Sequence, residues 1–301
     1  MMERNMQKGI AFAILAAALY AVNAPFSKIL LDFMPPTLMA GFLYIGAGAG
    51  MVLIALARRL RNTERKELGL TRPELPYTVA MILLDIAAPI CLMFGLRATT
   101  AANAALLNNF EIVATAMIAL LIFGEKISLR LWMGILFVTL SCAVLSFEDL
   151  SSLRFSHGSL LVLLAAVCWG FENNCTRKIS CKDPLEIVLL KGIFSGCGSI
   201  IIGLCTGERI TAVWSIAAVL CVGFVAYGLS IYFYVYAQRL LGAARTSAYY
   251  AVAPFIAAAF SLIIFREIPK NTYFLALGLM AAGAWLSAQD KPLFKSRRNT
   301  R

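Results

Sequence analysis

The segment "GIAFAILAAALYAVNAPFSK" (residues 9–28) recurs in altered form as "GSLLVLLAAVCWGFENNCTR" (residues 158–177). The two segments are 149 residues apart (158 − 9), and at this shift Gly9 lies over Gly158 and Tyr20 lies over Trp169. Both segments are apolar over a length close to what a membrane-spanning helix requires. The chain therefore contains a repeated, membrane-like unit.

A second alignment marks the end of each unit. At a shift of 142 residues (263 − 121), "LIFGEKIS" (121–128) lies over "IIFREIPK" (263–270), which pairs Glu125 with Glu267. We therefore divide the chain into a first repeat at residues 1–150, a second repeat at 151–290 and a basic tail at 291–301.

The composition indicates that lipid is the solvent for most of the chain. Of the 301 residues, 60% are hydrophobic and only 14% are charged, and the mean hydropathy is +0.80. Soluble domains carry roughly 25% charged residues. A water-soluble body of this size could not be covered by so few charges.

Ten apolar stretches are long enough to cross a bilayer, which needs roughly 17–25 residues per helix. In lipid every backbone polar group must be paired internally, so we expect helices and an all-α integral membrane protein. Each repeat would hold five spans, and this odd number turns the second repeat upside down relative to the first. The predicted spans are 9–31, 36–57, 76–96, 101–123, 128–147, 158–178, 185–206, 214–238, 244–265 and 271–288.

The basic residues predict how the chain is oriented. With the N-terminus in the cytoplasm, 20 of the 27 Lys and Arg residues fall in inner segments, six fall in outer loops, and Lys191 lies within a span. Positive loops remain in the cytoplasm. We therefore expect both termini to lie in the cytoplasm, and the protein to lie in the cytoplasmic (plasma) membrane. The basic residues behind the net charge of +11 are concentrated in the loops on one side of the membrane. A nucleic-acid-binding patch would not be divided in this way, which argues against nucleic acid as a partner.

Catalytic and metal-binding signatures are missing from the sequence. Eight cysteines form no C-x-x-C pair, and His157 is the only histidine, so we predict free thiols and no metal site. Neither a phosphate-binding loop, a dinucleotide fingerprint nor a hydrolase elbow is present. We expect no cofactor and no enzymatic activity.

These features together resemble the drug/metabolite transporter superfamily and its EamA-domain family. The resemblance rests on the ten spans, the two five-helix repeats and the acidic turns "GEK" (124–126) and "REI" (266–268). It implies a secondary transporter, more often an exporter. Members often carry Glu-Pro in spans four and nine. Here the Glu and the Pro fall in different halves: Glu111 is followed by Ile112 in the first half, and Pro254 follows Ala253 in the second.

Three acids fall inside predicted spans, where an ionisable side chain is costly and suggests function. They are Asp85, Glu111 and Glu172. Burial disfavours the charged form of a carboxyl group, so Glu111 could exchange protons at physiological pH. The alternative is that the acids pair with Lys191 or join polar contacts between helices. Asn108, one turn before Glu111, is a further predicted contact.

Polar and aromatic residues gather on related helix faces. Tyr20, Asn23 and Ser27 follow helical spacing in span one, and the aligned Trp169, Glu172 and Thr176 do so in span six. Facing each other across a pseudo-two-fold axis, they would line one cavity. Further tyrosines in spans eight and nine are predicted to join it: Tyr227, Tyr234 and Tyr250. Alternatively, tyrosine and tryptophan form belts at the membrane interface.

Prolines and glycines predict breaks and close contacts. Pro25, Pro89 and Pro254 cannot donate a backbone hydrogen bond, and broken helices at the membrane midplane are typical of transporter sites. The glycines of "GAGAG" (46–50) and "GIFSGCG" (192–198) favour close helix packing, although sliding surfaces share this feature.

The sequence favours a secondary active transporter, a proton-coupled exporter of a small organic metabolite. Acids and aromatic rings suit a cationic or zwitterionic substrate, such as an amino acid or amine, through charge pairing and cation–π contacts. A passive facilitator or channel is the alternative, and a membrane-embedded enzyme or receptor is a weaker one. The predicted partners are the substrate, protons and the lipid bilayer, with a homodimer left open.

Overall fold

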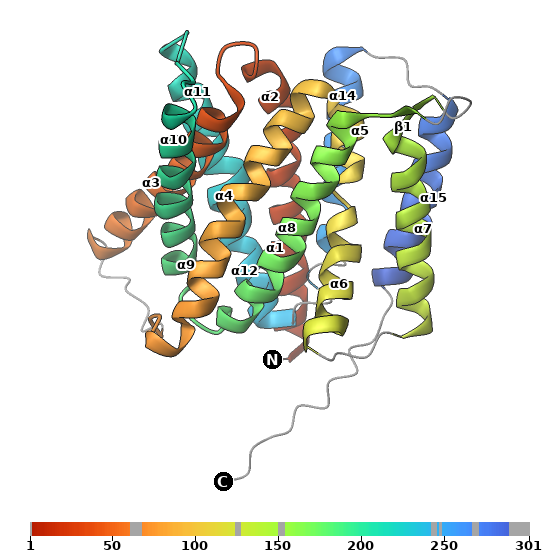
Figure 1. Cartoon of the computed structure of the whole chain (residues 1–301). Coiled ribbons are helices and arrows are strands. Elements are labelled where there is room, and N and C mark those ends of the chain that lie inside the picture. The colour runs from red at the N-terminus through yellow and green to blue at the C-terminus, as the bar shows by residue number, and fades with distance from the viewer. Residues whose placement is uncertain are drawn as a thin grey trace.

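The structure, a computed structural model, describes residues 2–60, 68–123, 128–149, 154–241, 246, 249–266 and 271–288. Its helices run between an upper and a lower side in Figure 1, with the N-terminus at the lower side. In chain order they are α1 (Met2–Ala21), α2 (Asn23–Leu30), α3 (Pro36–Leu60), the short turn η1 (Arg72–Glu74), α4 (Leu75–Ala98), α5 (Ala101–Leu107), α6 (Phe110–Phe123), α7 (Leu129–Ser146), α8 (His157–Ile179), α9 (Pro184–Leu190), η2 (Lys191–Ser195), α10 (Gly196–Cys205), α11 (Trp214–Gly223), η3 (Phe224–Leu229), α12 (Ser230–Leu241), α14 (Ala253–Phe265) and α15 (Asn271–Ala288).

One small element departs from the all-helical expectation. The connection from α7 to α8 contains two antiparallel strands, β1 (Phe147–Asp149) and β2 (Arg154–Phe155), in which Phe147 is opposite Phe155. This two-stranded hairpin lies at the upper side of the bundle (Figure 1). The hairpin pairs backbone N–H and C=O groups of this connection with each other.

Seven of the described helical segments are long and apolar enough to cross a membrane. Three further apolar helices, which match the predicted fifth, ninth and tenth spans, are shorter: Leu129–Leu145, Ala253–Phe265 and Asn271–Leu286. A multi-span helical protein is thus confirmed, while the count of ten stays a prediction. The seven segments are Met6–Leu30, Pro36–Leu60, Arg72–Ala98, Ala101–Ile122, His157–Ile179, Pro184–Cys205 and Trp214–Leu241.

Two of the three prolines coincide with helix breaks. Helix α1 ends at Ala21, four residues before Pro25, and α2 begins at Asn23. Proline has no N–H, so Pro25 cannot donate to the Ala21 carbonyl. Pro254 lies in the first turn of α14, directly after a turn at residues 251–252. By contrast, α4 continues from Leu75 to Ala98 without interruption at Pro89.

The break in the fourth span was not predicted, because no proline marks it. Helices α5 and α6 are separated at Asn108 and Asn109. The backbone N–H groups of Asn109, Glu111 and Ile112 donate to carbonyls three residues earlier, instead of four. These shorter bonds form a tightened turn, which separates the two helices without a proline. This correction moves Glu111 from mid-helix to the first turn of α6.

Close helix contacts depend on the two glycine-rich segments. A Cβ on Gly192 would lie 2.3 Å from the backbone nitrogen of Gly48, and one on Gly46 would lie 2.2 Å from the carbonyl oxygen of Leu220. Helix α3 therefore touches η2 and α11 backbone to backbone, as small residues permit in membrane proteins. The packing interpretation of these glycines is supported by this geometry.

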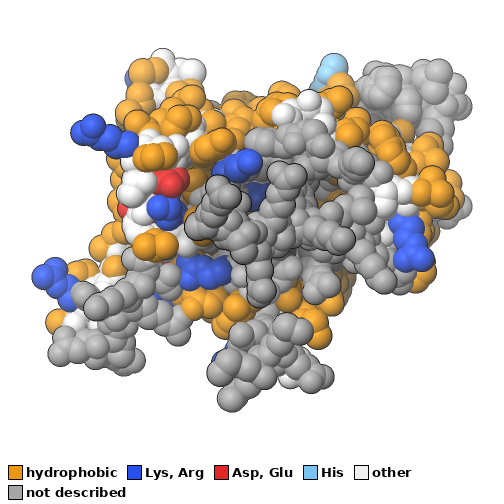
Figure 2. All heavy atoms as spheres, turned by 90° about the horizontal axis from the view of Figure 1, so that it is seen from below, with side chains coloured by type: hydrophobic (Ala, Val, Ile, Leu, Met, Phe, Trp, Pro, Cys, Tyr) orange, Lys and Arg blue, Asp and Glu red, His pale blue; other side chains and the backbone are white. Residues whose placement is uncertain are grey.

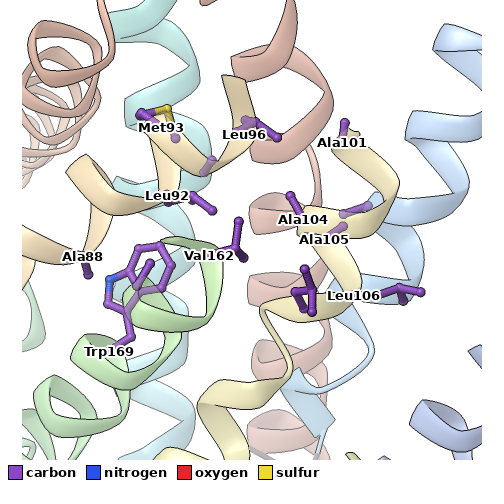
Figure 3. Packing of buried hydrophobic residues seen from close by; sticks show 14 of the residues in the cluster. Ala88, Leu92, Met93, Leu96, Ala101, Ala104, Ala105, Leu106, Val162 and Trp169 are labelled. Carbon is purple, nitrogen blue, oxygen red and sulfur yellow. The ribbon is translucent and has the colours of Figure 1, made fainter. Parts of the chain in front are cut away.

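Part of the apolar interior of the bundle lies between α4, α5 and α8. Figure 3 shows Leu92 and Leu96 of α4 near Val162 of α8, with Ala104 of α5 beside them. All four side chains are almost completely buried. Alanine-rich α5 can approach its neighbours closely, because its side chains are small.

Candidate functional site

An ionic cluster lies in the middle of the bundle. Lys191 Nζ is 2.5 Å from Glu172 Oε1 and 3.2 Å from Asp85 Oδ2. The three residues are only 3%, 4% and 1% exposed, respectively. Asp85 comes from α4, Glu172 from α8 and Lys191 from the start of η2, so the cluster links both halves of the chain.

Two hydroxyl groups complete the cluster. Tyr44 of α3 donates a 2.7 Å hydrogen bond to Asp85 Oδ1, and Thr176 donates to Glu172 Oε1. Buried charges persist when they are paired and hydrogen-bonded, and breaking such a pair is costly. Asp85 and Glu172 are therefore paired with Lys191, as the alternative interpretation of the acids predicts.

Glu111 has a different environment. It lies in the first turn of α6 and accepts a hydrogen bond from Asn173 Nδ2 of α8. No Lys or Arg forms an ion pair with it in the part of the chain that the structure describes. The N-terminal end of a helix favours a nearby negative charge, whereas burial opposes it. Glu111 is therefore held by a neutral amide and a helix end, without a neutralising cation.

Aromatic rings surround these charges. Tyr20, at the end of α1, contacts Trp169 at 6.5 Å between ring centroids, and Tyr227 and Tyr250 at 5.9 Å each. Tyr44 approaches Tyr227 to 5.0 Å. The predicted meeting of Tyr20 and Trp169 thus occurs, in an edge-to-face arrangement.

One cavity joins the acids and the rings. Of the ten residues predicted for the site, eight line this main cavity: Tyr20, Asp85, Glu111, Trp169, Glu172, Tyr227, Tyr234 and Tyr250. The remaining lining residues are Tyr44, Asn173, Thr176, Lys191, Ile231 and Val235. The structure brings the predicted set together, and its role in binding stays a prediction.

The other two predicted residues, Asn23 and Asn108, line a smaller neighbouring cavity beside Pro254. Tyr20 lines both cavities. Its hydroxyl accepts a 3.0 Å hydrogen bond from Asn108 Nδ2, and Asn23 Nδ2 donates a 3.2 Å bond to the hydroxyl of Tyr227. These two asparagines therefore fix the tyrosines that separate the cavities, and they do not reach the main cavity themselves.

Three polar or charged lining residues, and the apolar Ile231 and Val235, were not predicted to line the cavity. Tyr44 and Asn173 lie inside membrane spans, and both carry hydrogen-bonding groups that lipid cannot satisfy. Lys191 was considered only as a partner for the acids, although a buried lysine is itself a sign of a functional site. Attention to every polar side chain within the spans would have found all three.

Two segments with wider helical turns adjoin the cavity. The π-helical segment η2 begins with Lys191, and the π-helical segment η3 contains Tyr227. Such insertions occur often at functional sites, where they rotate side chains relative to the rest of a helix. Both segments pack against α3. They bring the amine of Lys191 and the ring of Tyr227 to the cavity wall.

All eight cysteines are free thiols in the structure, as predicted. The acidic turns that contributed to the family resemblance, with Glu125 and Glu267, lie outside the described residues.

Comparisons with known proteins agree with this architecture. A crystal structure of a protein matches 93% of this chain and 95% of its own, with a TM-score of 0.69 and 16% identity, which shows a shared fold. An uncharacterized transporter of Methanothermobacter thermautotrophicus (strain ATCC 29096 / DSM 1053 / JCM 10044 / NBRC 100330 / Delta H) is 27% identical over 141 residues. That match covers 44% of this chain and only 41% of the relative.

The sequence pattern of one family matches nearly the whole chain, in two successive copies. It covers residues 7–147 and again residues 156–289. Together with the membrane-length helices, this makes the protein a multi-pass membrane transporter rather than an enzyme. The chain belongs to the EamA-like transporter family.

Proposed function

We propose that the protein is a secondary active transporter that exchanges protons for a small organic metabolite, cationic or zwitterionic, in the direction of export. The observation that carries the proposal is the environment of Glu111. This carboxyl group lies at a helix break, in a cavity in the middle of the bundle, without a cationic partner among the described residues. Such a group can be neutralised by a proton or by a substrate cation in turn.

Inverted repeats support the proposal, because transporters use them to open one site to either side of the membrane. We assign ten spans, five in each of the repeats at 1–150 and 151–290. Under this assignment the helix contacts form symmetric sets: α4 packs on α8 as α1 packs on α12, and α6 packs on α8 as α1 packs on α14. Three further pairs join equivalent spans, namely α3 with α10, α5 with α14 and α7 with α15.

Glycine contacts repeat in the same way. A Cβ on Gly9 would meet Leu240 Cβ at 3.1 Å, and a Cβ on the aligned Gly158 would meet the carbonyl carbon of Ala98 at 2.7 Å. At the shift of 142 residues, Ala98 lies over Leu240 (98 + 142). The aligned glycines therefore touch aligned partners, as a pseudo-two-fold relation between the repeats requires.

The distribution of charge supports an orientation with both termini in the cytoplasm. Figure 2 shows the lower side of the molecule, where Lys and Arg side chains are prominent around the rim. The N-terminus is on this side (Figure 1). Cytoplasmic loops carry an excess of Lys and Arg. We therefore assign the lower side to the cytoplasm and place the protein in the cytoplasmic membrane.

Proton coupling at Glu111 must operate beside other ionisable groups. Asp85, Glu172 and Lys191 line the same cavity, and Tyr20 and Tyr250 interact electrostatically with Glu111. The first three groups are already paired with one another. Glu111 is the one of the three acids that forms no ion pair with a described residue, which is why we assign the coupling role to it.

Transport into liposomes tests this function. Purified protein is reconstituted, and labelled amines and amino acids are offered with and without an imposed pH gradient, with protein-free liposomes subtracted as a blank. A proton-coupled transporter accumulates a substrate above its external concentration only when the gradient is present. The alternative function, a passive facilitator, equilibrates the substrate to the same level in both conditions.

A further inference from the structure

The charges that line the main cavity do not balance. Three carboxyl groups, Asp85, Glu111 and Glu172, face one amine, Lys191, so the formal charge is −2 (−3 + 1) when all are ionised. Lys191 is within ion-pair distance of both Asp85 and Glu172. The paired cluster thus keeps a negative excess, and Glu111 adds a second negative charge.

A substrate carboxylate would find no cation in this cavity, among the described residues, that is not already ion-paired. Lys191 is the only cationic side chain among the described lining residues, and two carboxylates already occupy it. A third carboxylate would repel both of them in a medium that screens charge weakly.

Helix ends do not replace the missing cation. A broken helix can offer its N-terminal N–H groups to an anionic substrate group. In α6 this position is taken by Glu111, which lies in the first turn. Helix α14 begins with Ala253 and Pro254, and proline has no N–H to donate. The breaks that begin α6 and α14 are therefore poorly suited to bind an anion.

A cation fits the same surroundings well. Tyr20 holds Trp169, Tyr227 and Tyr250 around it within 6.5 Å between ring centroids, and each ring can attract a positive charge through its face. Ile231 and Val235 add an apolar wall. Glu111 supplies a counter-charge for an ammonium group.

We infer that the cavity selects a monovalent organic cation, an ammonium group on an apolar or aromatic body, and rejects the zwitterion built on the same body. This inference rests on the proposed function for the premise that the cavity binds a transported substrate. It narrows the substrate class from cations and zwitterions to cations alone.

Three probes with the same phenyl body separate the charge types. Phenethylamine carries an ammonium group only, phenylalanine carries an ammonium and a carboxylate, and hydrocinnamate carries a carboxylate only. Binding of each probe is measured by calorimetry at neutral pH, with purified protein in lipid nanodiscs. We expect phenethylamine to bind roughly tenfold or more tightly than phenylalanine, the effect of a single well-formed charge or cation–π contact. Hydrocinnamate should show no saturable binding.

Two variants tie the preference to Glu111. Glu111→Gln should reduce phenethylamine affinity roughly tenfold and bring it close to that of phenylalanine, because the counter-charge is lost. The matched control is Glu74→Gln, which removes an acid in the turn before α4, outside the lining of the cavity. Its phenethylamine affinity should equal that of the unmodified protein.

The inference is overturned if phenylalanine or hydrocinnamate binds as tightly as phenethylamine, or if phenethylamine does not bind. It is also overturned if Glu111→Gln keeps the full preference for the amine. Equilibrium binding needs no gradient, so this result is independent of proton coupling. A protein that prefers the amine but shows no gradient-driven flux would refute the proposed function and leave the charge selectivity intact.

Discussion

Lys191 and Glu172 form an ion pair, 2.5 Å between Nζ and Oε1, at a depth in the bundle where either charge alone would be costly. The same ammonium reaches Asp85 in the other half of the chain at 3.2 Å. Lys191 therefore forms ion pairs with an acid from each half of the chain, and its charge neutralises part of the negative charge of the cavity. Lys191 therefore affects both the stability of the fold and the charge of the cavity.

Removal of Lys191 should destabilise the protein strongly. Lys191→Met leaves two buried carboxylates without their cation, and breaking a buried pair costs about 3–5 kcal/mol. We expect a lower unfolding temperature in detergent, with partial recovery at acidic pH as the stranded carboxyl groups take up protons. The matched control is Lys182→Met, which breaks the more exposed pair with Glu74 and should cost about 1 kcal/mol or less. Equal unfolding temperatures for the two variants would show that the buried pair contributes little.

The close contact between α3 and η2 predicts a steric effect. A Cβ at Gly192 would lie 2.4 Å from Gly48 Cα, so Gly192→Ala must force the two helices apart. We expect a loss of about 1–3 kcal/mol, typical of overpacking, seen as a lower unfolding temperature. Gly278→Ala is the control, because a Cβ there meets nothing within 4 Å and alanine favours a helix. An unchanged Gly192→Ala protein would mean that η2 can move away freely.

The paired rings at the centre of the cavity predict a loss of binding without a loss of fold. Tyr20→Ala or Trp169→Ala removes one wall, and each should weaken phenethylamine binding roughly tenfold. Insertion and gel-filtration behaviour should stay normal. Trp285→Ala serves as the control, since Trp285 is 61% exposed on α15 and should leave binding unchanged. If both cavity variants fail to yield folded protein, the rings are packing residues.

Two native cysteines can report the orientation of the chain. Cys181 is exposed in the connection that follows α8, and Cys205 is exposed at the last residue of α10. The span formed by α9, η2 and α10 lies between them, so the assigned topology places Cys181 in the cytoplasm and Cys205 outside. Variants that keep only one of them are treated in intact cells with a membrane-impermeant maleimide. Cys205 should react at once and Cys181 only after permeabilisation. Labelling of both from outside would contradict the assigned topology.

The sequence predicted the fold well where one physical rule dominates. Apolar length located the membrane helices, and Pro25 and Pro254 marked two of the breaks, because both signals are local. The break at Asn108 and Asn109 was not predicted, since it is a tightened turn of the backbone that no proline marks.

The site was predicted as a set of residues but not as an arrangement. Costly polar side chains inside apolar spans identified Asp85, Glu111 and Glu172. Their separation into a paired cluster and an unpaired acid depends on the register of η2, which sets the position of Lys191. No local pattern specifies such a π-helical turn, so only the structure could distinguish Glu111 from the other two acids.

That distinction predicts the behaviour of Glu111→Gln. Glutamine has nearly the same shape and can still bond to Asn173, so the variant should insert and fold. It cannot ionise, and therefore it cannot alternate between a proton and a substrate cation. With substrate raised above the weakened dissociation constant, exchange between equal pools at equal pH should persist in liposomes.

Uphill accumulation driven by a pH gradient should be lost in the same preparation. The reason is that exchange needs only a cavity that opens to both sides, whereas coupling needs a group that releases its proton to make room for the substrate. Glu74→Gln, in the turn that precedes α4, is the control and should retain both activities. Gradient-driven accumulation by Glu111→Gln at the level of the unmodified protein would show that Glu111 is a structural acid and that the coupling proton binds elsewhere.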